Sequence, residues 1–404
     1  MKNYPLLHTL WWTTFLLILL VIFWNLYAEI SIDKEFLTGS GFNNTVSYIK
    51  KQINGQYIIG GNFSTYNNSS GSNLIRLQSN GIKDSVFIGG NIGFSGSNIQ
   101  IKSIFQKTNG QYIIGWWGWS HYNGSMISSW ILQLNNDGSI DNTFLSQLWV
   151  GCDNMVQSII TQPLDGKILI GGDFINCKGT NVWRITRLTA SGTIDGTFNA
   201  QATLGKWANA TVRQVTLQND TSILIGWDFS LYNNISVQPL IRLTHTGWVD
   251  STFNLGSISG NNASSIKKFL IYTGSNNTLT GKIYGLGIFG GNNYIFRANS
   301  SGSIDGTFAP VIVNSGTQSF VFQTDGRIIV WDNNQLIRFN TNGTSDATFN
   351  ASWTLFSGSI LALEIVSETI EGNTPIQLLA WGNLAAFWTG IIGNIARINV
   401  IPDK

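Results

Sequence analysis

A short motif, Asp-x-x-Phe, occurs seven times along the chain and constrains the fold more than any other feature. Its aspartates are Asp33, Asp84, Asp141, Asp195, Asp250, Asp305 and Asp346. The phenylalanines that end successive motifs are 51, 57, 54, 55, 55 and 41 residues apart. A spacing near 50 that is kept this evenly indicates an array of one supersecondary unit.

The repeat that ends at Phe198 shows what this unit is. Its predicted strands cover residues 156–162, 167–174, 184–189 and 193–198. Asp165-Gly166 is a hairpin turn between the first two strands, and Gly192 ends the turn before the fourth. Four antiparallel strands in about 50 residues are one blade of a β-propeller. No helix is expected beyond residue 28.

An arginine marks the third strand of most repeats. Arg76, Arg187, Arg242, Arg297 and Arg338 each lie eight residues before the aspartate of the next motif, and Gln133 holds this place before Asp141. A three-residue hairpin with glycine in the left-handed position makes residues eight apart direct cross-strand partners. Arg187 is therefore expected to face Asp195, and opposite charges across a pair help to set the register. The repetition favours a structural role for these aspartates over a catalytic one.

Two incomplete repeats at the ends of the array predict how the ring closes. Asp33 has no arginine strand before it, and Arg397 has no Asp-x-x-Phe motif after it. We expect residues 30–36 to supply the fourth strand of the last blade, with Arg397 paired to Asp33. Closure protects the sheet edges. The prediction is an all-β, seven-bladed propeller over residues 29–404, with blades at about 37–87, 88–144, 145–198, 199–253, 254–308, 309–349 and 350–401 plus 30–36.

Residues 165–174, Arg187-Leu188 and 192–198 together resemble the bacterial delta-60 repeat β-propellers. The resemblance covers about residues 30–401 and departs from the pattern around Leu279 to Gly291. It implies an exported or surface protein and brings no catalytic residues to this chain.

The N-terminal segment predicts export. Residues 6–28 are apolar apart from a few polar side chains and reach about the 20 residues that span a bilayer. Leu26-Tyr27-Ala28 is a poor cleavage site, so residues 1–28 are expected to be a signal anchor that keeps the propeller outside the cytoplasm in a cell membrane. The alternative is a cleaved signal peptide and a secreted protein. Cys152 and Cys177 fall in one blade on the predicted long-loop face, and in an exported protein they are expected to form a disulfide rather than remain as buried thiols.

Tryptophan stands where the repeat calls for glycine. Aligned by eye, the second glycine of the pair that ends the second strand is Gly61, Trp116, Gly172, Trp227, Gly287, Trp331 and Trp381. Glycine and tryptophan are opposite extremes in size and backbone freedom. We predict that Trp116, Trp227, Trp331 and Trp381 are glycine in the natural protein, through a genetic code that reads UGA as Gly. The alternative is a genuine aromatic face that binds glycans.

Composition narrows the function without naming a ligand. Net charge is +2 with no basic run, which argues against nucleic acid, and two cysteines with three histidines are too few for a metal cluster. No catalytic motif, metal site or cofactor is predicted. The preferred function is a non-enzymatic scaffold for binding or adhesion at the cell surface, with an extracellular protein or glycan as partner. The alternatives are a polysaccharide hydrolase or lyase, which needs paired carboxylates or a histidine at the central channel, and a lectin with exposed tryptophans.

Overall fold

The computed structural model describes residues 29–36, 39–90, 93–127, 129–148, 151–198, 208–218, 222–226, 228–349, 356–367, 376–387, 390–391 and 393–401. The predicted membrane segment, residues 6–28, lies outside this part of the chain, and so does Trp227. None of the helices within the described ranges has the length and apolarity to cross a membrane.

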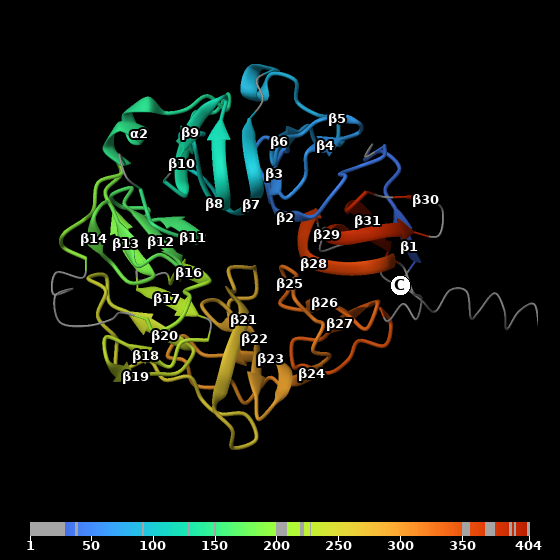
Figure 1. The fold of residues 1–404 in the computed structure, drawn as a ribbon. Coiled ribbons are helices and arrows are strands. Elements are labelled where there is room, and N and C mark those ends of the chain that lie inside the picture. The colour runs from blue at the N-terminus through green and yellow to red at the C-terminus, as the bar shows by residue number, and fades with distance from the viewer. Residues whose placement is uncertain are drawn as a thin grey trace, which may run out of the picture.

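Antiparallel sheets follow one another around a common centre (Figure 1). Within the described residues, seven sheets hold three strands or more. In chain order they are β2 (Val46–Lys51), β3 (Tyr57–Gly61) and β6 (Leu74–Leu77); β7 (Phe94–Gln106), β8 (Tyr112–Tyr122), β9 (Ser125–Ile127) and β10 (Ile131–Leu134); β11 (Val156–Thr161), β12 (Ile168–Gly172) and β15 (Ile185–Leu188); β16 (Gln214–Leu217), β17 (Ile223–Gly226) and β20 (Leu240–Leu243); β21 (Ala263–Ile271), β22 (Ile283–Phe289), β23 (Asn292–Ala298) and β24 (Val311–Val313); β25 (Phe320–Phe322), β26 (Ile328–Asp332) and β27 (Gln335–Phe339); and β28 (Phe356–Ser367), β29 (Ile376–Phe387), β30 (Gly390–Ile391), β31 (Ile395–Ile401) and β1 (Glu29–Ile32).

Small hairpins extend three of the connections between second and third strands. They are β4 (Thr65–Tyr66) with β5 (Ser69–Ser70), β13 (Asn176–Cys177) with β14 (Thr180–Asn181), and β18 (Leu231–Tyr232) with β19 (Ile235–Ser236). In each, a tyrosine or cysteine of the first small strand is buried, so the loop is held onto the body of the sheet.

The first and last described strands share one sheet. β1 runs antiparallel to β31, with Ile30 opposite Val400 and Ile32 opposite Ile398. The order in this sheet is β1-β31-β29-β28, which places β1 at its outer edge. The two ends of the described chain therefore meet by backbone hydrogen bonding.

The predicted fourth strand is shorter than expected. Leu188 forms a single bridge with Ile194, and a matching bridge occurs in five other repeats. Immediately afterwards the Asp195 carboxylate accepts a hydrogen bond from Thr197 N at 3.0 Å, and Phe198 N donates to the Asp195 carbonyl at 3.0 Å. This aspartate-nucleated turn ends the pairing. The prediction of a continuous strand over residues 193–198 is therefore wrong.

One repeat continues this turn as a helix, which the sequence analysis did not expect. α2 (Asn142–Leu148) follows Asp141, whose carboxylate accepts hydrogen bonds from Thr143 N at 3.0 Å and Phe144 N at 3.2 Å. An aspartate that accepts from the first free N–H groups is a favourable helix N-cap. A short 3-10 turn, η1 (Phe87–Gly90), follows the preceding motif.

The apolar cores lie between neighbouring sheets. Ile58 of the first sheet packs in one cluster with Ile101 of the second. Ile113 of the second sheet packs with Ile170 of the third, and Leu379 of the last sheet packs with residues of the first. Each sheet therefore buries both faces against its neighbours, and this apolar burial stabilises the ring.

Candidate functional site

The repeat arginines and aspartates form buried or half-buried ion pairs. The Nε–Oδ2 distances are 2.8 Å for Arg76–Asp84, 2.7 Å for Arg187–Asp195, 2.8 Å for Arg242–Asp250, 2.8 Å for Arg297–Asp305, 2.8 Å for Arg338–Asp346 and 2.7 Å for Arg397–Asp33. In the remaining repeat, Gln133 Nε2 donates to Asp141 Oδ2 at 2.8 Å. Every motif aspartate is thus bonded across its own hairpin, apart from Asp33, whose partner comes from the other end of the chain.

The same arginines also join consecutive repeats, a contact that sequence reasoning missed. Arg187 donates through a second nitrogen to the carbonyl of His245 at 2.6 Å, in the third-to-fourth-strand turn of the following repeat. Its guanidinium lies over the ring of Phe198, 5.0 Å from the centroid. Matching bonds to the next turn are made by Arg76, Arg242, Arg297 and Arg397.

The electrostatics of these aspartates favour the charged form. Burial alone would raise the pKa of Asp195, but hydrogen bonds from Thr197, Lys167 and Arg187 together hold that pKa well below its usual range. The Asp305 carboxyl has the same balance, with Lys282 and Thr307 as donors. A carboxylate that is committed to several donors makes a poor general acid, because it does not take up a proton near neutral pH.

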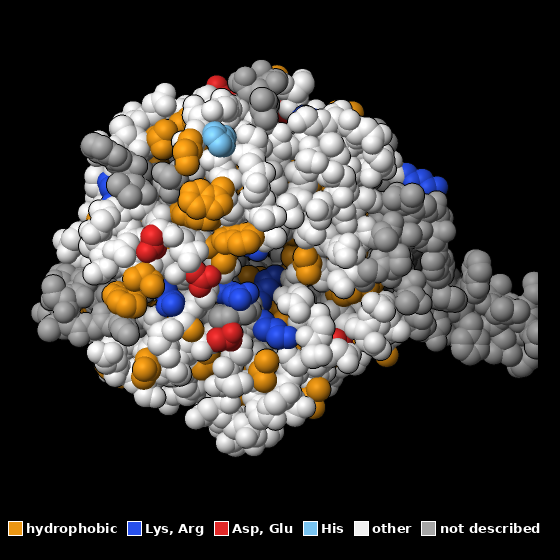
Figure 2. Space-filling model, in the orientation of Figure 1, with side chains coloured by type: hydrophobic (Ala, Val, Ile, Leu, Met, Phe, Trp, Pro, Cys, Tyr) orange, Lys and Arg blue, Asp and Glu red, His pale blue; other side chains and the backbone are white. Residues whose placement is uncertain are grey.

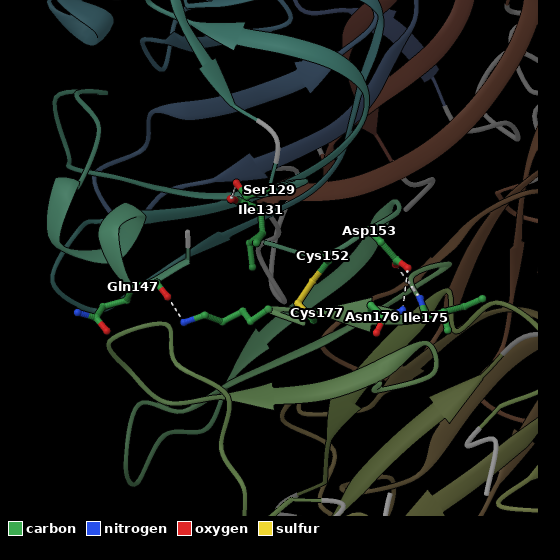
Figure 3. The surroundings of a disulfide bond; sticks show 9 residues. Ser129, Ile131, Gln147, Cys152, Asp153, Ile175, Asn176 and Cys177 are labelled. Atoms are coloured by element: carbon green, nitrogen blue, oxygen red, sulfur yellow. Dashed lines mark hydrogen bonds between the residues drawn. A yellow bond between two sulfur atoms is a disulfide. The ribbon is translucent and has the colours of Figure 1, made fainter. Parts of the chain in front are cut away.

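Cys152 and Cys177 form a disulfide between two loops (Figure 3). Beside it, the Asp153 carboxylate accepts a hydrogen bond from Ile175 N at 2.8 Å, so the same two loops are also joined by a polar contact. Both cysteines are fully buried. The disulfide therefore fixes the loop after α2 to the β13–β14 hairpin.

Strand register corrects the alignment of two tryptophans. The residue across from the repeat arginine is Ile58, Leu169, Ile329 and Leu379 in four of the repeats. The first and second glycines follow two and three positions later, as at Gly60 and Gly61. Counted in this way, Trp331 and Trp381 occupy the first glycine position, and Gly382 occupies the second. The alignment that placed both tryptophans at the second position is wrong, while Trp116 does lie there, opposite Ile101 at the strand bulge.

The second position leaves no room for a side chain in three repeats. A Cβ added at Gly61, Gly172 or Gly382 would lie 2.3, 2.1 or 2.2 Å from the backbone carbonyl oxygen of Thr45, Met155 or Ser359, which lie in or just before the first strand. Trp116 takes this place in the second repeat, where it is fully buried against Phe94. Its indole N–H has no hydrogen-bond partner among the described residues, which is costly for a buried donor.

Two further tryptophans have unfavourable local environments. The indole N–H of Trp381 is also buried without a partner in the described part of the chain. Trp130 has φ of 55°, at the position where Asn73 and Asn394 have φ of 66° and 68°. A left-handed φ suits Asn or Gly and is an outlier for a bulky residue. These features support the prediction that the natural protein has glycine at several tryptophan positions, which stays a prediction.

β8 also has exposed aromatic side chains that lie outside the repeat glycine positions. Burial alternates from Trp117 onward, so Trp117, Trp119 and His121 share the exposed face of the strand. Trp119 is 71% exposed, and Met126 of β9, opposite His121, is exposed as well. Figure 2 shows hydrophobic side chains over β8 and β9 that lead from the rim toward the centre.

Several of the strands nearest the centre are joined by hydrogen bonds, each to the sheet that follows it along the chain. These inner strands are β2, β7, β11, β16, β21, β25 and β28 (Figure 1). The contacts between them include Val215 N to Ser158 Oγ at 3.0 Å, Phe269 N to Gln214 Oε1 at 3.1 Å, Lys268 Nζ to Phe320 O at 3.1 Å and Leu363 N to Ser319 Oγ at 3.4 Å. Side chains at one level of the inner strands thus bond to the backbone of the next sheet.

Glu364 of β28 is the one acidic residue on the seven inner strands, which contain no histidine. Burial raises its pKa, opposed by Lys50, whose Nζ lies 3.5 Å from Glu364 Oε1. Burial also lowers the pKa of Lys268 to about 8. Within the described residues, no group of three or more His, Cys, Asp or Glu side chains is placed to hold a metal.

This ring of antiparallel sheets is a β-propeller fold, and comparison with known proteins agrees. A family profile described as "Domain of unknown function (DUF5122) beta-propeller" matches residues 52–87, 164–198 and 323–349. Each match ends at an Asp-x-x-Phe motif. No curated protein matches the chain. The family therefore supports the propeller repeat and supplies no activity.

Three solved structures share this fold with the chain at low sequence identity. The WD40 β-propeller domain of Doa1 is 12% identical, with 92% of this chain and 97% of that chain covered and a TM-score of 0.54. Extracellular domains assigned to the hybrid two-component systems BT4673 and BT3049 of B. thetaiotaomicron are 14% and 11% identical, each with 92% of this chain covered and a TM-score of 0.50. The chain spans only 39% and 41% of those two domains.

Proposed function

We propose that the chain is a non-enzymatic binding scaffold held outside the cytoplasm, with a rigid propeller that presents its loops to a ligand at the cell surface. The Cys152–Cys177 disulfide carries this proposal. Disulfides persist in oxidising compartments and are rare in the cytosol. The extracellular origin of the two B. thetaiotaomicron domains agrees with this placement.

In this proposal the ring has seven blades and is closed by β1. Seven Asp-x-x-Phe motifs match the seven sheets of three strands or more among the described residues. The pairing of β1 with β31 and the Arg397–Asp33 ion pair supply the closing contact. A ring closed in this way leaves no open sheet edge between its first and last blades.

The placement of the acidic residues favours a binding role over a polysaccharide hydrolase. A glycosidase needs two carboxyl groups about 5–10 Å apart across the bond that is cleaved. The motif aspartates are committed to arginine or glutamine partners, and Glu364 is the one acidic residue on the inner strands.

A lectin with an aromatic platform is the second candidate. Trp117 and Trp119 are exposed on one strand face, where sugar rings can stack on indoles. This candidate requires that both residues are tryptophan in the natural protein.

Protease accessibility in spheroplasts tests the proposed location. The full chain, with an epitope tag at its C-terminus, is expected to be degraded by added protease while a cytosolic control protein survives. Alkylation before and after reduction is expected to show Cys152 and Cys177 oxidised. A propeller that is protected from protease, with both thiols free, would contradict the proposal. Separation of membrane and soluble fractions then distinguishes an anchored from a secreted protein.

A further inference from the structure

One residue of each inner strand lies at a common level. In five sheets it is the extra residue of a β-bulge, namely Ser47, Lys102, Gln157, Lys267 and Leu361. Arg213 and Gln318 hold this level in the other two sheets. Gln214 pairs with Gly226 as Ser158 pairs with Gly171, and Phe320 pairs with Val330 as Ile159 pairs with Ile170. A bulged residue is left unpaired in the ladder and bends its strand locally.

Five consecutive sheets place hydrogen-bond donors at this level. We name Lys102, Gln157, Arg213, Lys267 and Gln318 the donor arc. Lysine and arginine are donors only, and glutamine supplies an amide. No acidic residue occupies the level in any of the seven sheets. Figure 2 shows Lys and Arg side chains gathered in the hollow at the centre of this face.

Lys102 and Lys267 of the donor arc are partly desolvated, and Lys102 is also repelled by Arg213. Burial lowers the pKa of Lys102, and the positive charge of Arg213 lowers it further. Burial also lowers the pKa of Lys267, whose Nζ donates to Ser315 O at 2.9 Å. An ammonium has three N–H donors, so this bond orients Lys267 and leaves its other N–H groups able to donate to a ligand. An anion at this level relieves the repulsion and accepts those donors.

We propose that the donor arc binds an acidic polysaccharide. Its carboxylate or sulfate groups lie against Lys102, Arg213 and Lys267, and its hydroxyls bond to Gln157 and Gln318. Three cations with two amides among them fit a chain that carries both charges and hydroxyls. A nucleic acid is a poorer match, because the protein has a net charge of only +2 and no basic run. The inference rests on the proposed function, since it names the ligand of that scaffold.

Titration calorimetry with defined polymers tests the proposal. The probes are polygalacturonate, dextran sulfate, neutral dextran and a single-stranded oligonucleotide. The variant is Lys102→Gln/Arg213→Gln, and the matched control is Lys34→Gln/Lys107→Gln, which removes the same charge away from the donor arc. Thermal melting checks that both variants are folded.

We expect the wild type to bind at least one of the two acidic polymers and to ignore neutral dextran. The donor-arc variant should bind roughly tenfold more weakly or worse, since two charge-assisted contacts are lost, and the control should match the wild type. Carboxylate and sulfate sources are distinguished by which polymer binds. No binding to either acidic polymer, equal losses in both variants, or tighter binding of the oligonucleotide overturns the inference. The proposed function is judged separately by the spheroplast experiment, so the two can fail independently.

Discussion

Arg397 and Asp33 are 364 residues apart in the chain, yet Arg397 Nε lies 2.7 Å from Asp33 Oδ2. The pair repeats the geometry of Arg187 and Asp195, which are only eight residues apart and also 2.7 Å apart. Even the aromatic contact recurs, with the Arg397 guanidinium 4.9 Å from the centroid of the Phe36 ring. A long-range contact thus replaces a local hairpin contact at the junction of the two chain ends.

This relationship predicts unequal costs for two similar substitutions. Asp33→Ala should lower the free energy of unfolding by about 3 kcal/mol or more, because it leaves a mostly buried arginine without its partner. Asp141→Ala should cost less, about 1–2 kcal/mol, because its cross-strand partner Gln133 is neutral and the main further loss is the N-cap of α2. Urea unfolding measures both.

Asp195→Ala serves as the control for charge alone, because it breaks an arginine pair within one hairpin. If Asp33→Ala lowers the free energy of unfolding more than Asp195→Ala does, the difference measures the contribution of the junction. Equal stabilities of the Asp33→Ala and Asp141→Ala proteins would count against the closure of the ring.

The aspartates also predict an acid limit to stability. The pKa of Asp195 is held below its usual range in the folded protein, whereas an aspartate titrates near about 3.9 in an unfolded chain. Its stabilising contribution is therefore present above about pH 4 and is lost as pH falls toward the folded pKa. The urea midpoint should fall as the pH drops below about 5, and Asp195→Asn should flatten this fall. A variant with the pH dependence of the wild type would refute this assignment.

The disulfide makes a prediction of its own. Removal of the crosslink by Cys152→Ser/Cys177→Ser should cost about 3 kcal/mol, since the cysteines are 25 residues apart and the unfolded loop regains its freedom. A reducing agent should lower the melting temperature of the wild type and leave the double variant unchanged. An identical response of both proteins would show that the crosslink does not form.

The sequence predicts the repeat well where the decisive contacts are local. Arg187 and Asp195 face each other across one three-residue turn, so their spacing alone reveals the pair. The bond from Arg187 to the His245 carbonyl joins different repeats, so it cannot be predicted from the spacing of residues within one repeat. Helix α2 was missed because Asp141 is the same motif residue as its equivalents, and only the residues after it extend the turn.

Strand register explains the other omissions. Trp331 and Trp381 were aligned one position too late, because text alignment of glycines does not follow the pairing of strands. Lys102 and Arg213 belong to no motif of the sequence. They lie at the same level only because each inner strand pairs in a fixed register with the second strand of its own sheet. The donor arc is therefore a property of the assembled ring.

The conflict at Trp116 predicts the composition of the natural protein. Peptides from its original source should contain glycine at positions 116, 227, 331 and 381. Trp130 should follow the same rule, because its φ of 55° suits glycine. Tandem mass spectrometry of these peptides gives the answer directly. Tryptophan at all of them would mean that the second repeat departs from the others, and it would strengthen the lectin candidate.

The proposed closure of a seven-bladed ring, on which the donor arc depends, is tested most directly by a crosslink across its junction. Ser31 of β1 lies opposite Asn399 of β31, and Gln377 of β29 lies on the far side of Asn399. Ser31→Cys/Asn399→Cys, in a Cys152→Ser/Cys177→Ser background, should oxidise to a disulfide that peptide mapping identifies. Ser31→Cys/Gln377→Cys should not, because its cysteines are two strands apart, about 9–10 Å. No crosslink in the first variant, or equal crosslinking in both, would contradict the closed ring.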